Sequence, residues 1–141
     1  MKLTLASVYA LHALAYVAGR KHDRPSASHH IARAQGLPER FLLKVLKTLA
    51  AADPPILTST KGPGGGYRLA RPASDITLLE VLEAVDRPVR GLAPAPHPHD
   101  GRKPLDKALH KRVEAACQGA ADVVRKHLEG VRVSDFVGKG K

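Results

Sequence analysis

The glycine-rich turn Lys61-Gly62-Pro63-Gly64-Gly65-Gly66 is the feature that most restricts the fold, because it separates two short β-rich segments. These segments are residues 56–60 (ILTST) and 67–69 (YRL). Isoleucine, threonine and tyrosine favour strands, and glycine adopts the positive φ angles of tight turns at little steric cost. The pattern predicts a β-hairpin with a basic tip. It does not indicate a nucleotide-binding loop, because no Gly-Lys-Ser/Thr occurs and no helix opens directly behind the turn.

A short helix is predicted over residues 26–36 (SASHHIARAQG), before the hairpin. Ser26 or Ser28 can cap its N-terminus, because a serine hydroxyl accepts a hydrogen bond from a free backbone N–H. Gly36 can end it in a left-handed conformation. The helix is therefore expected to close with a tight, glycine-containing turn.

A second helix is predicted to start at Pro38, which suits a first helical turn, and to run to about Ala52. Pro54 and Pro55 then stop it. Its apolar and basic residues fall on separate faces at helical spacing. The apolar stripe comprises Leu42, Val45, Leu46 and Leu49, and the basic face comprises Arg40, Lys44 and Lys47. The helix pair alone also fits an ordinary helical hairpin, but helix, turn, helix and β-hairpin in this order predict a winged helix-turn-helix.

Residues 3–18 at the N-terminus are apolar almost all round, with Ser7 and His12 as the main interruptions. One interpretation is a secretory signal, because Lys2 precedes the apolar run and small residues follow it. Two tyrosines and His12 break that run, however. We therefore adopt the other interpretation, a helix buried on most sides within a small helical core or a dimer.

Three further segments follow the hairpin. Residues 77–86 are predicted to form a helix, with Thr77 and Glu80 at the spacing of a capping box. Residues 87–104 contain five of the eleven prolines and predict an extended linker or loop. The last segment is predicted to be a long amphipathic helix over 105–128, with an apolar stripe of Leu105, Leu109, Val113, Ala116, Ala120, Val124 and Leu128.

The long terminal helix has more apolar face than so small a domain can cover alone. A matching helix from a second subunit is the natural partner, although the helix could also fold back on its own chain. We expect a winged helix-turn-helix DNA-binding domain at 1–86, the proline-rich linker at 87–104, and a dimerisation helix with its tail at 105–137. The expected fold class is mainly α with a small β-hairpin wing.

The charge of the chain indicates a polyanionic partner. The 141 residues carry a net charge of +10, and residues 1–72 hold eleven basic and only three acidic side chains. This imbalance predicts a localised anion-binding face in the N-terminal half. No apolar run is long enough to cross a bilayer, so no membrane partner is expected.

Three segments resemble the Rrf-type winged-helix transcriptional regulators, which include the iron–sulfur cluster regulator, the nitrite-sensitive repressor and the cysteine-metabolism repressor. They are MKLTLASVYALHAL at the N-terminus, IARAQGLPERFLLKVLKTL, and KGPGGGYRLARPASDITLLEVLEAVD. The resemblance is close over about residues 1–90 and looser through the terminal helix. It implies a cytoplasmic homodimer that binds palindromic double-stranded promoter DNA, with the terminal helix crossing to the partner subunit.

The resemblance also implies the residues that contact DNA. Residues 38–47 would be the recognition helix in the major groove, and Lys61 would point the wing at the minor groove. The candidate DNA-binding residues are Pro38, Arg40, Lys44, Lys47, Lys61, Gly64, Gly65 and Arg68. Leu43 stands among positions that are often polar in the family and can offer a base only apolar contact, such as to a thymine methyl. We therefore expect an operator unlike that of the iron–sulfur members.

Cluster-binding members of the family carry three cysteines before the terminal helix, because iron–sulfur clusters are held mainly by thiolates. This chain has only Cys117, so we expect no cluster, no other cofactor and no assigned metal site. Two minor alternatives stay open. His97, His99 and Asp100, joined by His110, have side chains that ligate metals, although such histidines are more often solvated. Cys117 is either a redox switch or, more simply, a small packing residue.

The function expected is that of a dimeric, sequence-specific DNA-binding transcriptional regulator, and specifically a repressor. Its two recognition helices would address half-sites about 34 Å apart. The alternative is a winged-helix interaction module that acts through a protein partner or RNA. An enzyme is not indicated, because no nucleophile–base pair, paired acids or cofactor fingerprint is found.

Overall fold

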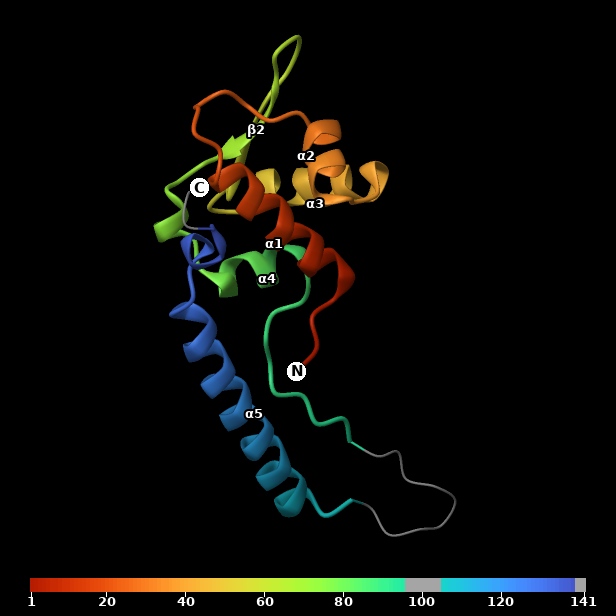
Figure 1. Ribbon diagram of the computed structural model, residues 1–141. Helices are drawn as coiled ribbons and strands as arrows, with labels where there is room; N and C mark the ends of the chain where they lie inside the picture. Colours follow the sequence, from red (N-terminus) through yellow and green to blue (C-terminus); the bar gives the residue numbers. More distant parts are fainter. Residues whose placement is uncertain (96–104, 139–141) are drawn as a thin grey trace.

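The computed structural model describes residues 1–95 and 105–138. Its elements follow the order α1 (Leu5–Ala18), α2 (Ser28–Gln35), α3 (Glu39–Ala51), β1 (Leu57–Thr60), β2 (Gly66–Leu69), α4 (Leu78–Val85) and α5 (Lys107–Glu129) (Figure 1). Two short 3-10 turns, η1 (Ala73–Asp75) and η2 (Val133–Phe136), flank α4 and α5. The predicted fold class, mainly α with a small β-hairpin wing and a long terminal helix, is confirmed.

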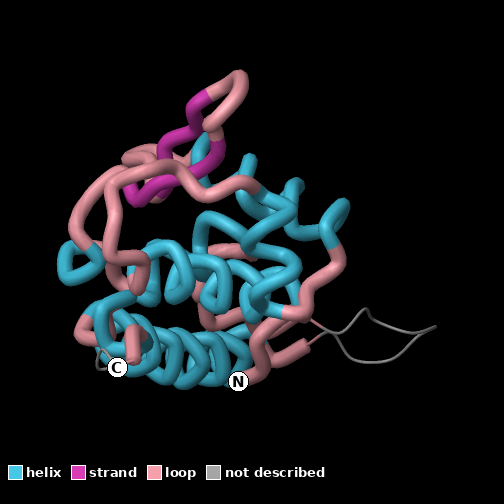
Figure 2. The backbone as a smooth tube through the Cα atoms, turned by 45° about the horizontal axis from the view of Figure 1, so that its top comes forward, coloured by secondary structure: helices cyan, strands magenta, loops and turns pink. Residues whose placement is uncertain are grey.

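The core of the winged helix lies between α1, α2, α3 and the base of the hairpin. Leu14 of α1, Ile31 of α2, and Leu42 and Leu46 of α3 are fully buried there. Burying one such side chain contributes about 1.5–3 kcal/mol to folding. Most positions of α1 are buried or half-buried, as predicted for this apolar segment. The hairpin projects beyond this helical core on one side (Figure 2).

The N-terminus of α2 differs from the prediction. Its N-cap is Ala27, and neither Ser26 nor Ser28 supplies a side-chain cap. Ser26 is buried and exchanges two backbone hydrogen bonds with Tyr67 of β2, of 2.9 and 2.8 Å. Pairing with the wing therefore holds this residue outside the helix. The C-terminal prediction is confirmed, because Gly36 has a left-handed φ of 64°.

The start of α3 is displaced by one residue from the prediction. Pro38 has an extended ψ of 122° and is the N-cap, so the helix begins at Glu39. Glu39 places a negative charge in the first turn, where the helix dipole favours it. The helix ends at Ala51, because Ala52 is already extended.

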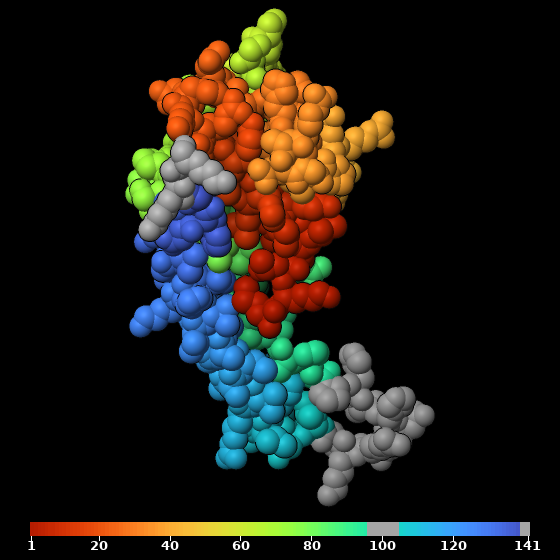
Figure 3. All heavy atoms as spheres, viewed as in Figure 1, coloured from red at the N-terminus to blue at the C-terminus, as the bar shows by residue number. Residues whose placement is uncertain are grey.

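The terminal helix α5 packs against α4 through its C-terminal part. Leu128 packs against Leu79 and Leu82 of α4, with Val124 at the edge of this cluster. The N-terminal half of α5 extends away from the helices of the winged helix (Figures 1 and 3). The helix starts at Lys107, two residues later than predicted.

The segment between α4 and α5 is described over residues 86–95 and 105–106. Its first part lies so close to α5 that a Cβ placed on Gly91 would lie 2.2 Å from the carbonyl group of Cys117. The candidate metal ligands His97, His99 and Asp100 lie outside the described residues. Within the described ranges, no helix is both long enough and apolar enough to span a membrane.

Candidate nucleic-acid interface

Helix α3 divides into a buried face and a basic face, as predicted. Leu42, Val45, Leu46 and Leu49 are buried in the core. Arg40, Lys44 and Lys47 are exposed on the opposite side. None of these three side chains forms an ion pair in the described part of the chain, so their charges are available to an external anion.

Two features fix the direction in which this basic face points. The Phe41 ring stacks edge-on against Tyr9 of α1, with centroids 5.3 Å apart and planes at 82°. Leu43 is half-buried and packs against the core, so only part of its surface could reach a base. The aromatic contact was not predicted from the sequence, because the two residues are 32 positions apart and share no periodic pattern.

The wing is a two-stranded antiparallel hairpin in which Thr58 pairs with Arg68 and Thr60 with Gly66. Lys61 is exposed at its tip. Gly64 has a φ of 74°, which favours glycine, and open space surrounds its Cα. Gly65 is required for a different reason, because a Cβ there would lie 2.2 Å from the Thr60 carbonyl oxygen. The glycines therefore shape the wing itself, whatever the wing contacts.

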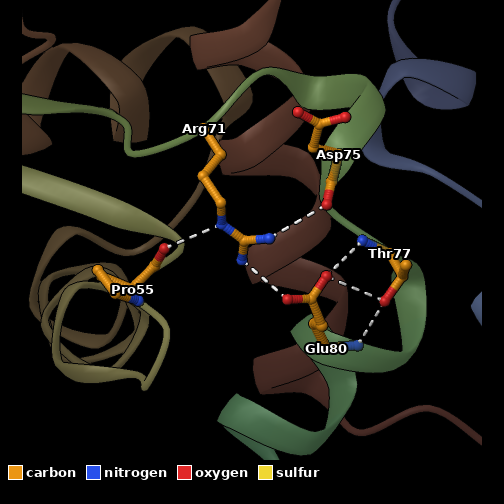
Figure 4. A network of polar contacts seen from close by, with 5 residues as sticks. All are labelled: Pro55, Arg71, Asp75, Thr77 and Glu80. Carbon is orange, nitrogen blue, oxygen red and sulfur yellow. Dashed lines mark hydrogen bonds and ion pairs between the residues drawn. The ribbon is translucent and has the colours of Figure 1, made fainter.

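An ion-pair network anchors the wing to α4 (Figure 4). Arg71, just after β2, donates to the Asp75 carbonyl at 3.1 Å and to Glu80 Oε1 at 2.8 Å. The other carboxylate oxygen of Glu80 accepts the Thr77 backbone N–H at 2.9 Å, which completes the predicted capping box. Burial alone would raise the pKa of Glu80. The hydrogen bonds from Thr77 and the nearby Arg71 guanidinium outweigh burial and lower this pKa below its ordinary value.

The loop between α1 and α2 runs beside β2 and brings further basic side chains to the wing. Arg20, Lys21 and Arg24 are all exposed there. Arg68 of β2 donates to the Asp23 carbonyl across a 3.4 Å contact. Arg68 therefore faces this loop, whereas Arg40, Lys44 and Lys47 share the surface of α3. Sequence analysis missed the loop arginines, because only the net charge of residues 1–72 could have indicated them.

The apolar stripe predicted for α5 is mostly uncovered. Leu109 is 56% exposed and Val113 is 44% exposed, and Ala116 and Ala120 are also exposed. Folding back on the same chain therefore accounts for only the C-terminal end of the stripe.

The described residues hold no group of three or more histidine, cysteine, aspartate or glutamate side chains placed to bind a metal ion. His110 instead lies 3.5 Å from Glu114, one turn further along α5. Cys117 is half-buried and free. A cluster bound by three thiolates of one chain does not fit this sequence, because it has a single cysteine.

Comparison with known proteins gives a family match over nearly the whole chain. The family described as Rrf2, iron-dependent transcriptional regulator, matches residues 3–139. Protein aau3 of Rhizobium meliloti is 40% identical over 86 residues, which are 61% of this chain and 54% of that protein. The HTH-type transcriptional regulator IscR of Photobacterium profundum is 37% identical over 89 residues, 63% of this chain and 51% of that protein. The matched part thus spans about half the length of these relatives.

Solved structures show the same fold. CymR, the global cysteine regulator of B. subtilis, matches with a TM-score of 0.69 at 20% identity, over 96% of this chain and 95% of that chain. At this identity the likeness establishes the winged helix with its long terminal helix. The matched family, IscR and CymR are transcriptional regulators, not enzymes, in agreement with the sequence analysis.

Proposed function

This chain belongs to the Rrf2 family of transcriptional regulators, and we propose that it is a homodimeric repressor that binds a palindromic DNA sequence. The observation that carries this proposal is the unpaired basic face of α3. Arg40, Lys44 and Lys47 project from one side of a helix whose other side is fixed in the core. A helix of this kind fits the major groove, where arginine and lysine recognise guanine through its O6 and N7 atoms.

The wing would add contacts beside the major groove. Lys61 at its tip carries a positive charge, and the surrounding glycines keep the tip narrow. A narrow basic hairpin suits the minor groove or a neighbouring phosphate. The anchor from Arg71 to Glu80 keeps the hairpin at a defined angle to α4, so its contacts would stay in register with those of α3.

A second copy of the chain is the occupant we assign to the exposed stripe of α5. Leu109 and Val113 would be buried against the same apolar stripe of a partner helix, because a twofold interface uses one surface patch on both subunits. A twofold dimer places two recognition helices on half-sites about 34 Å apart, and this geometry requires a palindromic operator. Binding there would block access to a promoter, and the protein would act in the cytoplasm, where the DNA is.

Sensing in this chain would not use an iron–sulfur cluster held by three thiolates of one chain. A cluster needs several thiolates, and Cys117 supplies one per chain. We therefore assign no cofactor, and the effector stays open.

Fluorescence anisotropy tests the proposal directly. The full chain is titrated onto the DNA upstream of its own gene and onto a scrambled duplex, at several salt concentrations. If it contacts about eight phosphates, log K should fall with log salt at a slope near −7, and the native duplex should bind at least tenfold tighter. Equal binding to both duplexes contradicts sequence recognition. No binding at low salt contradicts the DNA function and favours a protein partner.

A pair of matched variants locates the interface. Arg40→Ala should weaken binding to the native duplex by about tenfold or more, because a lost base contact costs about 1–3 kcal/mol. Arg90→Ala removes the same charge from the segment that follows α4 and should leave the affinity within about twofold. Equal losses in both variants would show that net charge, and not α3, determines the affinity.

A further inference from the structure

A polar crevice of about 540 Å³ lies at the base of the wing, between the hairpin and the loop that joins α1 to α2. Arg20, His22 and Arg24 line it from the loop, and Arg68 lines it from β2. Asp23 is the one carboxylate among its lining residues. Three guanidinium groups thus face a common space beside a single acid.

The two walls of the crevice are held together by the backbone. Ser26 pairs with Tyr67 through two hydrogen bonds in an isolated β-bridge, so this end of the loop lies directly against β2. A Cβ on Gly66 would lie 2.3 Å from the Ser26 carbonyl oxygen, which shows how closely these segments pack. The basic loop is therefore attached to the wing at Ser26.

On the loop side of the crevice, contacts within the protein already hold the Arg20 side chain in position. The Arg20 guanidinium stacks 5.2 Å from the Tyr16 ring centroid and donates from Nε to His22 Nε2 at 3.1 Å. Because Nε2 accepts, the imidazole proton resides on Nδ1. That nitrogen is shielded from water and has no hydrogen-bond partner in the described chain.

The charge in the crevice is not neutralised from within. Neither Arg20, Arg24 nor Arg68 has a carboxylate at ion-pair distance within residues 1–95 and 105–138. Guanidinium groups bind phosphate oxygens through paired N–H donors, and several together favour a multiply charged oxyanion. We propose that this crevice binds a phosphate group, with Arg24 and Arg68 as its main ligands.

The phosphate could belong to the DNA backbone that flanks the operator or to a small phosphorylated molecule. Both present the same oxygens to the same donors. The crevice is separate from the basic face of α3. The proposal that it binds phosphate does not depend on DNA binding, because inorganic phosphate alone would occupy it.

The first experiment uses inorganic phosphate. The ¹⁵N-labelled full chain is titrated with sodium phosphate while sodium chloride holds the ionic strength constant. We expect saturable shifts confined to the amides of residues 20–26 and 67–70. In the double variant Arg24→Ala/Arg68→Ala, the phosphate affinity should fall by about tenfold or more, since hydrogen bonds to charged groups contribute about 1.5–3 kcal/mol.

Two controls keep this test decisive. Arg24 and Arg68 are exposed, so the double variant should unfold at the temperature of the unmodified chain. Arg90→Ala should retain the phosphate affinity within about twofold. A linear response without saturation, or an equal loss in Arg90→Ala, would overturn the proposal.

A second experiment identifies the source of the phosphate. The DNA affinity of the full chain is measured for two duplexes. One ends at the operator, and the other extends beyond the position of the wing. If the DNA backbone is the source, only the longer duplex gains affinity, and the double variant loses that gain with a salt slope reduced by about 1–2. If a free phosphate is the source, flank length has no effect while inorganic phosphate still saturates. Arg40→Ala separates the two proposals, because it should weaken DNA binding without changing the phosphate titration.

Discussion

Arg125 of α5 donates a hydrogen bond from Nη1 to Glu83 Oε1 of α4 at 2.7 Å. The same nitrogen lies 3.4 Å from the Val89 carbonyl oxygen, so one side chain contacts α4 and the segment that follows it. These contacts flank the apolar contact of Leu128 with Leu82. The apolar cluster and this partly exposed ion pair therefore contribute to the direction in which α5 leaves the winged helix, together with the backbone pairing of Leu78 with Val131 and of Ile76 with Val133.

Replacing Arg125 by methionine should loosen this junction. We expect the free energy of unfolding to fall by about 1 kcal/mol or less, since both partners are partly exposed, and amide exchange in the last turns of α5 to accelerate. Gln118→Met on the same helix is the control, because Gln118 bonds only to Asp122 of α5. Hydrogen exchange followed by mass spectrometry checks both variants. Equal protection of α5 in Arg125→Met and the unmodified chain would contradict this role.

The low pKa of Glu80 makes the stability of the wing anchor depend on pH. A carboxyl whose folded pKa lies below its ordinary value of 4.5 stabilises the fold above that value. This contribution is lost as the pH falls through the lowered folded pKa. Glu80→Gln should therefore cost about 1 kcal/mol at neutral pH and progressively less below about pH 4.5. Urea unfolding from pH 7 to pH 3 checks this, with the exposed Glu129→Gln as control, and a pH-independent difference would contradict it.

Gly65 should be the least replaceable residue of the wing tip. A Cβ there would lie 2.2 Å from the Thr60 carbonyl oxygen, so Gly65→Ala must displace the backbone of the turn. Gly62→Ala is the matched control, because open space surrounds Gly62 and the cost arises only from its φ of 88°. That cost is about 1–2 kcal/mol. Amide chemical shifts of residues 57–69 should change more in Gly65→Ala than in Gly62→Ala, and the reverse order would be inconsistent with this packing.

Local patterns in the sequence predicted most of the fold. The apolar stripe of α3, the capping box of Thr77 and Glu80, and the left-handed Gly36 are each determined within a few residues, and each was found. The predicted serine cap of α2 was wrong, because a distant contact and not the local sequence determines where this helix begins. A serine near a helix start favours a cap by local rules, but the pairing of Ser26 with Tyr67 depends on a strand 41 positions away.

The candidate interface was only partly predictable for the same reason. Arg40 and Lys44 share a helix face by simple spacing, so the sequence alone groups them. Arg24 and Arg68 meet only because the loop follows β2, and no periodicity links them. The contacts of all these residues with DNA stay predictions, since the geometry supplies a surface and not a partner.

Lys61 at the wing tip should strengthen DNA binding through its attraction to phosphates or to the negative potential of the minor groove, and should not contribute to sequence recognition. Lys61→Ala should weaken binding to native and scrambled duplexes by similar factors and reduce the salt slope by about 0.9. Lys126→Ala removes the same charge from the exposed surface of α5 and should leave the slope unchanged. Anisotropy titrations at four salt concentrations check both variants. A loss confined to the native duplex would assign Lys61 to base recognition instead.

The uncovered stripe of α5 makes the oligomeric state sensitive to single substitutions. Val113 is 44% exposed in one chain, and a twofold interface on this stripe would bury it in both subunits. Val113→Glu would then place two like charges in an apolar contact, so we expect a dimer to dissociate at least a hundredfold more readily, which corresponds to about 2.7 kcal/mol. Gln118→Glu adds the same charge on the opposite side of the helix and should leave the dimer intact. Sedimentation equilibrium distinguishes these outcomes. A monomer in the unmodified chain, or equal dissociation in both variants, would show that this stripe is not the dimer interface.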